Sequence, residues 1–173
     1  WELCLTDDYD MEHAYVERIC QEYIEKDRNY LLEHKELKAR VGQESRIRYG
    51  RHERNGGIAG NTNFCLELAT GDYIGLFDHD DILHPAVLYE YMKAICGQNA
   101  DYIYCDEATF KGNSIDHMIT LHFKPDFAID NLRANNYICH FSVFSRKLLD
   151  GTELFRPQFN GSQDHDMILR LTA

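Results

Sequence analysis

Residues 73–85 read YIGLFDHDDILHP, an apolar stretch that runs directly into acids and a histidine and then reaches a proline. The first five residues are typical of a buried strand, and the proline is typical of the first turn of a helix. A strand followed by an acidic loop and a helix is the repeating unit of an α/β domain. This stretch therefore predicts the fold class.

The same unit recurs on both sides of this stretch. Strand and helix patterns alternate along the chain, which favours an open, mostly parallel sheet with helices on both faces. We expect one such α/β/α domain over residues 1–173. The predicted strands cover residues 1–6, 46–50, 73–77, 101–105 and 141–144. The predicted helices cover residues 10–39, 58–69, 85–96 and 164–171.

Composition narrows the choice of partners and compartment. Eighteen Lys and Arg stand against 29 Asp and Glu, for a net charge of -11, which disfavours binding to nucleic acid. The six cysteines are scattered without zinc or redox spacing, which predicts reduced core thiols and a cytoplasmic protein. No run approaches the roughly 20 apolar residues of a membrane span, and the first residues lack the pattern of a signal peptide.

Three of the predicted strands end in acids, and ligands of open α/β sheets bind at the carboxyl ends of strands. In an extended chain Asp78 and Asp80 face one side, and such oxygen donors suit Mg²⁺ or Mn²⁺ carrying a diphosphate. A solvated acidic loop without a ligand is the alternative. The three acidic strand ends are Asp7-Asp8, Asp78 to Asp81, and Asp106-Glu107.

Longer motifs carry a resemblance to a known family. NGGIAGNTNFCLELATGDYI, which begins at Asn55, runs into GLFDHDDILHP and strongly resembles family 2 glycosyltransferases of the GT-A fold. The resemblance extends to WELCLTDD, DYIYCDEATF, FKPDFAIDNLRANNYICHFSVF and GSQDHDMILRL, in the order that the family has them. It is closest to the bacterial subgroup that builds surface polysaccharides, such as rhamnosyl- and galactosyltransferases. It implies a three-layer α/β/α GT-A sandwich.

For the first part of the chain, to about residue 110, the resemblance implies a site for a UDP- or dTDP-sugar donor. Asp8 would contact the uracil or thymine ring, Asp78 would lie near the ribose, and Asp80, together with Asp78, would hold the metal ion. The glycines at the start of the helix expected at residues 58–69 also allow a ligand to approach the backbone closely. The family places three further donor-side residues on this helix: Asn55, Gly56 and Asn63.

For the second part, about residues 111–173, the resemblance implies the acceptor side and the catalytic base. Asp164 matches the base that takes the proton of the acceptor hydroxyl as the sugar is transferred with inversion. The start of a helix favours the ionised carboxylate that a base requires. An ordinary acid of the first helical turn is the alternative. The acceptor side would further include Asn136, Tyr137 and Gln163, and His140 and His165 are weaker candidates there.

The chain departs from the family in lacking the usual first strand, which reads roughly IIIPVYN, and the helix after it. We therefore expect an N-terminally truncated domain. The expected activity is metal-dependent transfer from a nucleotide sugar to a glycan or lipid-linked glycan during synthesis of a bacterial surface polysaccharide. The site would lie in the cytoplasm, with attachment to the inner face of the plasma membrane left open. The rival functions are a metal-dependent phosphoester hydrolase and a non-catalytic sugar-nucleotide binding domain.

Overall fold

The computed structural model describes residues 1–9, 14–112 and 114–173, and these form two compact units. Unit 1 consists of Trp1–Gly71 and Glu153–Asp166, and unit 2 consists of Asp72–Thr152 and Met167–Ala173. The helix α6 (Gln163–Leu171) begins in unit 1 and ends in unit 2. None of the described helices is long and apolar enough to cross a membrane.

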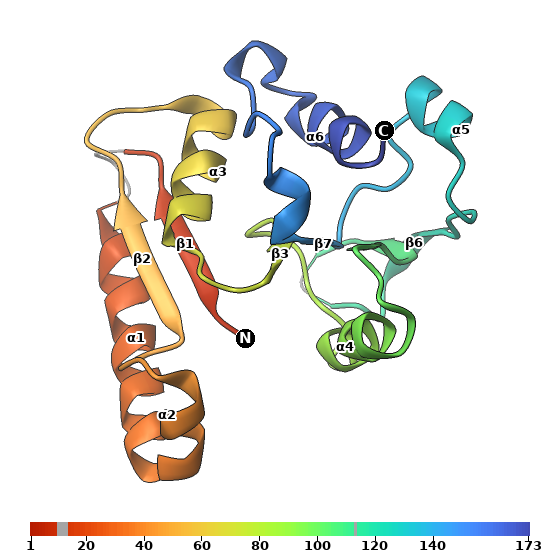
Figure 1. Cartoon of the computed structure of the whole chain (residues 1–173). Helices are drawn as coiled ribbons and strands as arrows, with labels where there is room; N and C mark the ends of the chain where they lie inside the picture. Colours follow the sequence, from red (N-terminus) through yellow and green to blue (C-terminus); the bar gives the residue numbers. More distant parts are fainter. Residues whose placement is uncertain (10–13, 113) are drawn as a thin grey trace. The chain divides into compact units, whose positions relative to one another are not determined.

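Unit 1 is built on a parallel pair of strands, β1 and β2, as the alternation of strands and helices predicts. Helix α1 packs along β2 and helix α3 along β1 (Figure 1). Because the strands are parallel, the ends of both, with Asp7 opposite Arg51, lie at the same edge. The elements are β1 (Leu3–Asp7), α1 (Tyr15–Glu33), α2 (Lys35–Val41), β2 (Ile47–Arg51), α3 (Gly57–Leu68) and a 3₁₀ turn, η2 (Pro157–Phe159).

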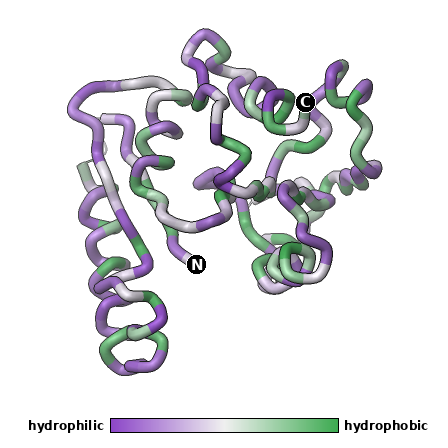
Figure 2. Tube along the Cα trace, in the orientation of Figure 1, coloured by the Kyte–Doolittle hydropathy of each residue, from purple (hydrophilic) through white to green (hydrophobic). Residues whose placement is uncertain are grey.

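Helix α1 is largely hydrophilic, with hydrophobic residues recurring along it (Figure 2). Its buried residues, Cys20, Ile24, Asp27 and Leu31, are spaced by three and four and so form one face. The acid among them is fully engaged, since Asp27 accepts hydrogen bonds from Ser45 Oγ at 3.0 Å and from the backbone and guanidinium of Arg46. Burial acts to raise the pKa of Asp27, but these hydrogen bonds outweigh it and hold the pKa below its ordinary value.

The long helix expected at residues 10–39 is two helices, α1 and α2, that meet at His34. His34 has φ −113° and ψ 69°, outside the helical region. Its ring stacks on Tyr30 with centroids 4.0 Å apart, and its Nδ1 lies 2.8 Å from the Tyr30 carbonyl. The backbone N–H of His34 also donates to this carbonyl, at 3.1 Å, so the ring and the backbone of His34 together cap the end of α1. The expected start of the helix, residues 10–13, lies outside the described residues.

Unit 2 contains a three-stranded sheet in which β7 lies between β3 and β4 and runs antiparallel to both. Strands β5 and β6 form a separate antiparallel hairpin. The core beside the sheet joins Leu132, Ile138 and Ile168, each at most 1% exposed. The elements are β3 (Tyr73–Leu76), α4 (Val87–Gln98), β4 (Tyr102–Ile103), β5 (Glu107–Phe110), β6 (Met118–His122), α5 (Ile129–Ala134), β7 (Ser142–Ser145) and a 3₁₀ turn, η1 (Arg146–Leu149).

Unit 2 differs from the sequence-based expectation in two ways. The strand expected at residues 141–144 is present as β7, but its antiparallel direction departs from the parallel pattern seen in β1 and β2. All four residues of β7, Ser142 to Ser145, are buried, and the sequence pattern indicated a strand without indicating its direction. The hairpin β5–β6 was not expected, because every residue of β6 is exposed and the apolar pattern follows no buried face.

All six cysteines are free thiols, as expected from their spacing. Their burial differs from the expectation of core thiols, since Cys20 alone among them is buried, Cys96 is exposed, and the other four are half-buried. Cys96 lies near the end of α4, on a helix in which Tyr91 is the buried residue. Its helical position, set by the packing of α4, decides its exposure.

Candidate active site

The two acids at the end of β1 have different surroundings. Asp7 accepts a hydrogen bond from Tyr49 Oη at 3.2 Å, lies 3.6 Å from Arg51 Nε, and has a side chain only 10% exposed. Burial and the charge of Asp7 raise the pKa of Tyr49 to about 12, so the phenol remains a hydrogen-bond donor at neutral pH. Asp7 is thus committed to partners within unit 1.

Asp8 is held by the start of α3. Its Oδ1 accepts from the backbone N–H of Gly56 at 2.6 Å, and the side-chain amide of Asn55 donates to its carbonyl at 3.3 Å. A carboxylate has two acceptor oxygens, so a carboxylate oriented in this way retains capacity for a ligand N–H. The structure therefore brings three of the sequence-predicted donor residues together: Asp8, Asn55 and Gly56.

The first turn of α3 is fixed by a residue that the sequence reasoning missed. Asn160 Oδ1 accepts from the backbone N–H of Ala59 at 3.0 Å, and so satisfies one of the backbone donors that have no partner within the helix at its start. Gly57 has φ +69°, and a Cβ added there would lie 2.9 Å from Asn160 Nδ2. Ala59 and Asn160 lie 101 positions apart in the sequence, so no local sequence pattern predicts this contact.

Asn63, also predicted on the donor side, has a different set of contacts. Its side-chain amide donates to the carbonyl of Phe155 at 2.8 Å and accepts from the N–H of Phe155 at 2.9 Å. Phe155 is only 2% exposed. These two hydrogen bonds therefore link Asn63 of α3 to residues 153–162, and not to the group around Asp8.

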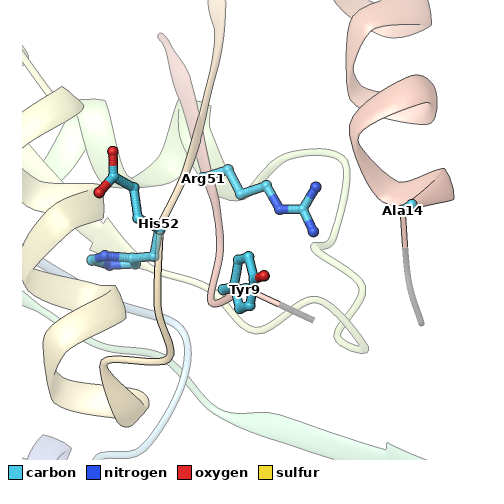
Figure 3. Close-up of a pocket in the computed structure, with 5 residues that line it drawn as sticks. Tyr9, Ala14, Arg51 and His52 are labelled. Atoms are coloured by element: carbon cyan, nitrogen blue, oxygen red, sulfur yellow. The ribbon is translucent and has the colours of Figure 1, made fainter. Parts of the chain in front are cut away.

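A hollow of about 500 Å³ lies beside the end of β2 (Figure 3). The guanidinium of Arg51 lies 5.5 Å from the ring centroid of Tyr9, a cation–π distance. His52, the next residue, tilts against Phe64 with ring centroids 4.5 Å apart. An aromatic ring and a planar guanidinium at the edge that carries Asp8 form a surface suited to stacking against a planar ring. The hollow is lined by Tyr9, Ala14, Arg51, His52 and Glu53.

The predicted base, Asp164, lies in the first turn of α6 and is half-buried. Gln163 Nε2 lies 3.4 Å from Asp164 Oδ1, while Gln163 Oε1 accepts from the N–H of Gly161 at 2.7 Å. The neighbouring Asp166 differs, because it forms a two-pronged ion pair with Arg156, whose Nε donates at 3.1 Å. The position of Asp164 at a helix start favours its ionised form.

In unit 2 the acidic stretch after β3 is exposed at all four positions, Asp78 to Asp81. The N–H of Asp81 donates to the carbonyl of Asp78 at 3.2 Å, which bends the stretch into a turn. His140 Nε2 lies 3.3 Å from Asp78 Oδ2. Partial desolvation raises the pKa of Asp81, although its side chain is exposed; the charge of His140 opposes this rise, and the charges of Asp78, Asp80 and Glu107 add to it.

The donor set of this stretch fits a hard divalent cation. Mg²⁺ and Mn²⁺ favour one or two protein carboxylates together with phosphate and water oxygens, and Asp78 and Asp80 offer carboxylates. The closely spaced negative charges disfavour one another unless a cation lies among them. Within the described part of the chain, no group of three or more His, Cys, Asp or Glu side chains gathers into a metal-binding arrangement.

The predicted acceptor-side residues of unit 2 are engaged within their own unit. Asn136 Oδ1 accepts from the N–H of Cys139 at 3.3 Å. Tyr137 Oη accepts from the N–H of Ala128 at 2.9 Å, and its ring packs edge-on against Tyr104 with centroids 6.0 Å apart. A contact of either residue with an acceptor stays a prediction.

Comparison with known proteins gives the family. The model of glycosyl transferase family 2 matches residues 1–152, which is most of the chain. The chain therefore belongs to this family, as the motifs around residues 55–85 predicted.

The relatives also show the extent of the match. The chain is 36% identical to the uncharacterized protein y4gI of Sinorhizobium fredii and 34% identical to the O-antigen biosynthesis protein RfbC of Myxococcus xanthus. These matches cover 98% and 79% of the chain but only 17% and 11% of the relatives, so the chain spans less than a fifth of their length. The crystal structure of S. aureus TarS 1-349 matches with a TM-score of 0.65 at 18% identity, over 98% of this chain and 45% of that one. This likeness shows the GT-A fold.

Proposed function

We propose that this chain is the catalytic part of an inverting, metal-dependent glycosyltransferase that uses a nucleoside-diphosphate sugar. The observation that carries the proposal is the fixing of Asp8 by Gly56 and Asn55 at the end of β1, in a chain of this family. A carboxylate held in place by backbone and amide donors is preorganised to accept a ring N–H. We infer a UDP- or dTDP-sugar donor, because uracil and thymine both present such an N–H.

Unit 1 would recognise the nucleoside of the donor. Asp8 accepts the N–H of the pyrimidine ring, and the hollow beside it offers Tyr9 and Arg51 for stacking against that ring. Asn55 and Gly56 hold Asp8 in place for this contact. The glycine leaves room for the ligand to approach the backbone.

Unit 2 would hold the diphosphate through a divalent ion. Asp78, near the ribose, and Asp80 are the residues that would bind Mn²⁺ or Mg²⁺. When bound, such an ion neutralises negative charge on the departing nucleoside diphosphate. The exposure of Asp78 and Asp80 leaves their carboxylates accessible to this ligand.

Asp164 would act as the general base. It takes the proton from an acceptor hydroxyl as that oxygen attacks the anomeric carbon on the face opposite the diphosphate. The new glycosidic C–O bond forms while the bond to the diphosphate breaks, and the diphosphate leaves with the electron pair, so configuration inverts. Gln163, bonded to Gly161 and close to Asp164, would orient the base. Asn136 and Tyr137 would contact the acceptor.

We propose a glycan or lipid-linked glycan as the acceptor, in the synthesis of a bacterial surface polysaccharide on the cytoplasmic side of the membrane. The relative RfbC, described as an O-antigen biosynthesis protein, supports this choice. Peripheral attachment to the inner face of the plasma membrane is part of the proposal, since lipid-linked acceptors lie there.

Calorimetric titration of nucleoside diphosphates tests the proposal. We expect UDP or dTDP to bind only when Mn²⁺ is present, and CDP, ADP and GDP to bind more weakly at the same Mn²⁺ concentration. Release of UDP from a UDP-sugar in the presence of acceptor glycan then measures transfer. Binding without turnover would favour a non-catalytic sugar-nucleotide domain, and metal-dependent hydrolysis of a simple phosphoester would favour a phosphoester hydrolase.

A further inference from the structure

Unit 2 contains a buried lysine that the proposed reaction does not use. The side chain of Lys124 is only 4% exposed, although an ammonium group is costly to bury without partners. Its Nζ has three such partners: Glu107 Oε2 at 2.9 Å, the carbonyl of Ile138 at 2.5 Å and the carbonyl of His140 at 3.0 Å. An ammonium has three N–H donors, so all of them are satisfied.

Two of these partners lie in the irregular segment Ile138–Phe141, just before β7. Outside a helix or sheet, the carbonyls of such a segment need other donors. Ser142 Oγ donates to the carbonyl of Cys139 at 2.7 Å, and Tyr91 Oη donates to the carbonyl of Phe141 at 2.8 Å. Together with Lys124, these side chains occupy four consecutive carbonyls, and Lys124 alone supplies two of the four bonds.

The segment Ile138–Phe141 also packs against the strand that leads to the acidic stretch. The ring of Phe141 stacks on Tyr91 with centroids 5.4 Å apart, and a Cβ added to Gly75 of β3 would lie 2.8 Å from that ring. At the other end, Ile138 is fully buried in the core of unit 2. Between these anchors lies His140, whose Nε2 is 3.3 Å from Asp78 Oδ2.

We propose that Lys124 is a positioning residue: by binding the carbonyls of Ile138 and His140, it holds the His140 imidazole beside Asp78 and so sets the orientation of the Asp78 carboxylate for a divalent cation. Glu107 serves this arrangement by balancing the ammonium charge. Groups that orient a metal ligand typically change metal affinity by about 10- to 100-fold when they are removed. The part of this inference that concerns the cation rests on the proposed function; the contact between His140 and Asp78 does not.

The test is Lys124→Met in the 173-residue chain, because methionine keeps an unbranched stem and removes the charge and all three donors. The first readout, without metal, is the nuclear Overhauser effect between the His140 ring protons and the Asp78 Hβ protons. We expect this signal to be lost. The second readout is Mn²⁺ affinity by calorimetry, which we expect to fall about 10-fold or more. The control is Tyr73→Phe, which removes a hydroxyl bonded to the carbonyl of Ala100 in the same unit and should change neither readout.

A merely structural role is distinguished by a double-variant cycle. In a chain that already carries His140→Ala, we expect Lys124→Met to cost no further Mn²⁺ affinity, since the ring to be positioned is gone. An equal loss in both backgrounds would show that Lys124 acts by general stability and would overturn the proposal. An unchanged His140–Asp78 signal in Lys124→Met would overturn it as well.

Lys124→Met leaves Glu107 without its ammonium partner, so a second variant guards against loss of the fold. Glu107→Gln combined with Lys124→Met removes both charges, and we expect it to fold and to show the same two losses. Failure of both variants to fold would contradict the proposal, which requires only His140 to move. If the wild-type chain binds no Mn²⁺, the metal role of Asp78 in the proposed function is wrong, and the metal-free signal still decides whether Lys124 positions His140.

Discussion

The acids of unit 1 and the acidic stretch of unit 2 are stabilised in different ways. Asp27 is buried and Asp7 is half-buried; both are engaged by guanidinium, hydroxyl or backbone donors, and Asp8 accepts from the N–H of Gly56. Residues 78–81 are exposed, and their charges lie close together on one short turn. The carboxylates of Asp7, Asp8 and Asp27 are therefore oriented by several donors of the protein, whereas in the acidic stretch of unit 2 the exposed Asp78 has the imidazole of His140 beside it and the stretch stays open to a cation.

The largest expected effect concerns Asp164, the acid of unit 1 that we propose as the general base. Asp164→Asn should lower the rate of sugar transfer by about 10²- to 10⁴-fold, because the amide does not accept the proton of the acceptor. Donor affinity should remain unchanged. The rate is measured by release of nucleoside diphosphate. The matched control is Asp166→Asn in the same helical turn, which should lower the melting temperature through its pair with Arg156 and retain transfer. Wild-type turnover in Asp164→Asn would remove the base from the mechanism.

The next effect tests whether unit 1 acids act as structural groups. Asp27→Asn should lower the free energy of unfolding by about 3–5 kcal/mol, because Arg46 is left with a buried, unpaired charge. Urea denaturation at pH 7 measures this. The control is Glu22→Gln, whose exposed pair with Lys26 should contribute almost nothing.

The same residue gives a pH dependence with a defined sign. Since the pKa of Asp27 is lower in the folded chain than its ordinary value near 4, its stabilisation is complete above about pH 4 and is lost as the pH falls through the folded pKa. The free energies of unfolding of wild type and Asp27→Asn should therefore approach each other as the pH falls through the folded pKa of Asp27. A constant difference between them down to pH 2 would contradict the assignment.

A smaller effect is expected for the acidic stretch of unit 2. Asp80→Ala should weaken Mn²⁺-dependent binding of a nucleoside diphosphate by about 2–5 kcal/mol, which is 30-fold or more, because a charged ligand group is lost. Calorimetry measures the affinity. Stability should not fall, since Asp80 is exposed. Asp101→Ala, an exposed acid of the same unit, is the control and should leave affinity unchanged. Equal affinity in Asp80→Ala would exclude it as a metal ligand.

The smallest expected effect concerns the turn that carries Gly56. Gly57→Ala should lower the free energy of unfolding by about 1–2 kcal/mol, because φ is +69° at this position. The control is Gly60→Ala, within α3 and with open space around the added Cβ, which should stabilise the chain slightly. Thermal unfolding compares the two. A Gly57→Ala chain as stable as wild type would show that this backbone conformation relaxes at no cost.

Much of the fold followed from local patterns. The predicted strands at residues 1–6, 46–50 and 73–77 correspond to β1, β2 and β3, because short apolar runs between turn residues have few other structures open to them. The break at His34 did not follow, since it depends on the contacts of the His34 ring with Tyr30 and not on the apolar pattern. The direction of β7 and the exposed hairpin β5–β6 did not follow either, since they depend on pairing between distant segments or on exposure.

The candidate site, like the fold, was predicted only in part from the sequence. The group of Asp8, Asn55 and Gly56 combines residues that motifs had singled out, and the structure joins them by hydrogen bonds. The contact of Asn160 with α3 and the link from Lys124 to His140 carry no sequence signal, because their partners lie far apart along the chain or are backbone carbonyls.

The sequence by itself determined the family, the alternation of strands and helices, and the acids placed at strand ends, because periodicity and motif spacing are properties of the chain alone. Only the tertiary structure decided which acids are engaged by the protein and which remain exposed. It gave Asp7 a hydrogen bond from Tyr49 but Asp8 one from Gly56, and it paired Asp166 with Arg156 but placed Asp164 beside Gln163. The two acids of each pair nevertheless lie within two residues of one another. The physical reason is that burial and hydrogen bonding of a charged group depend on what distant segments bring to it.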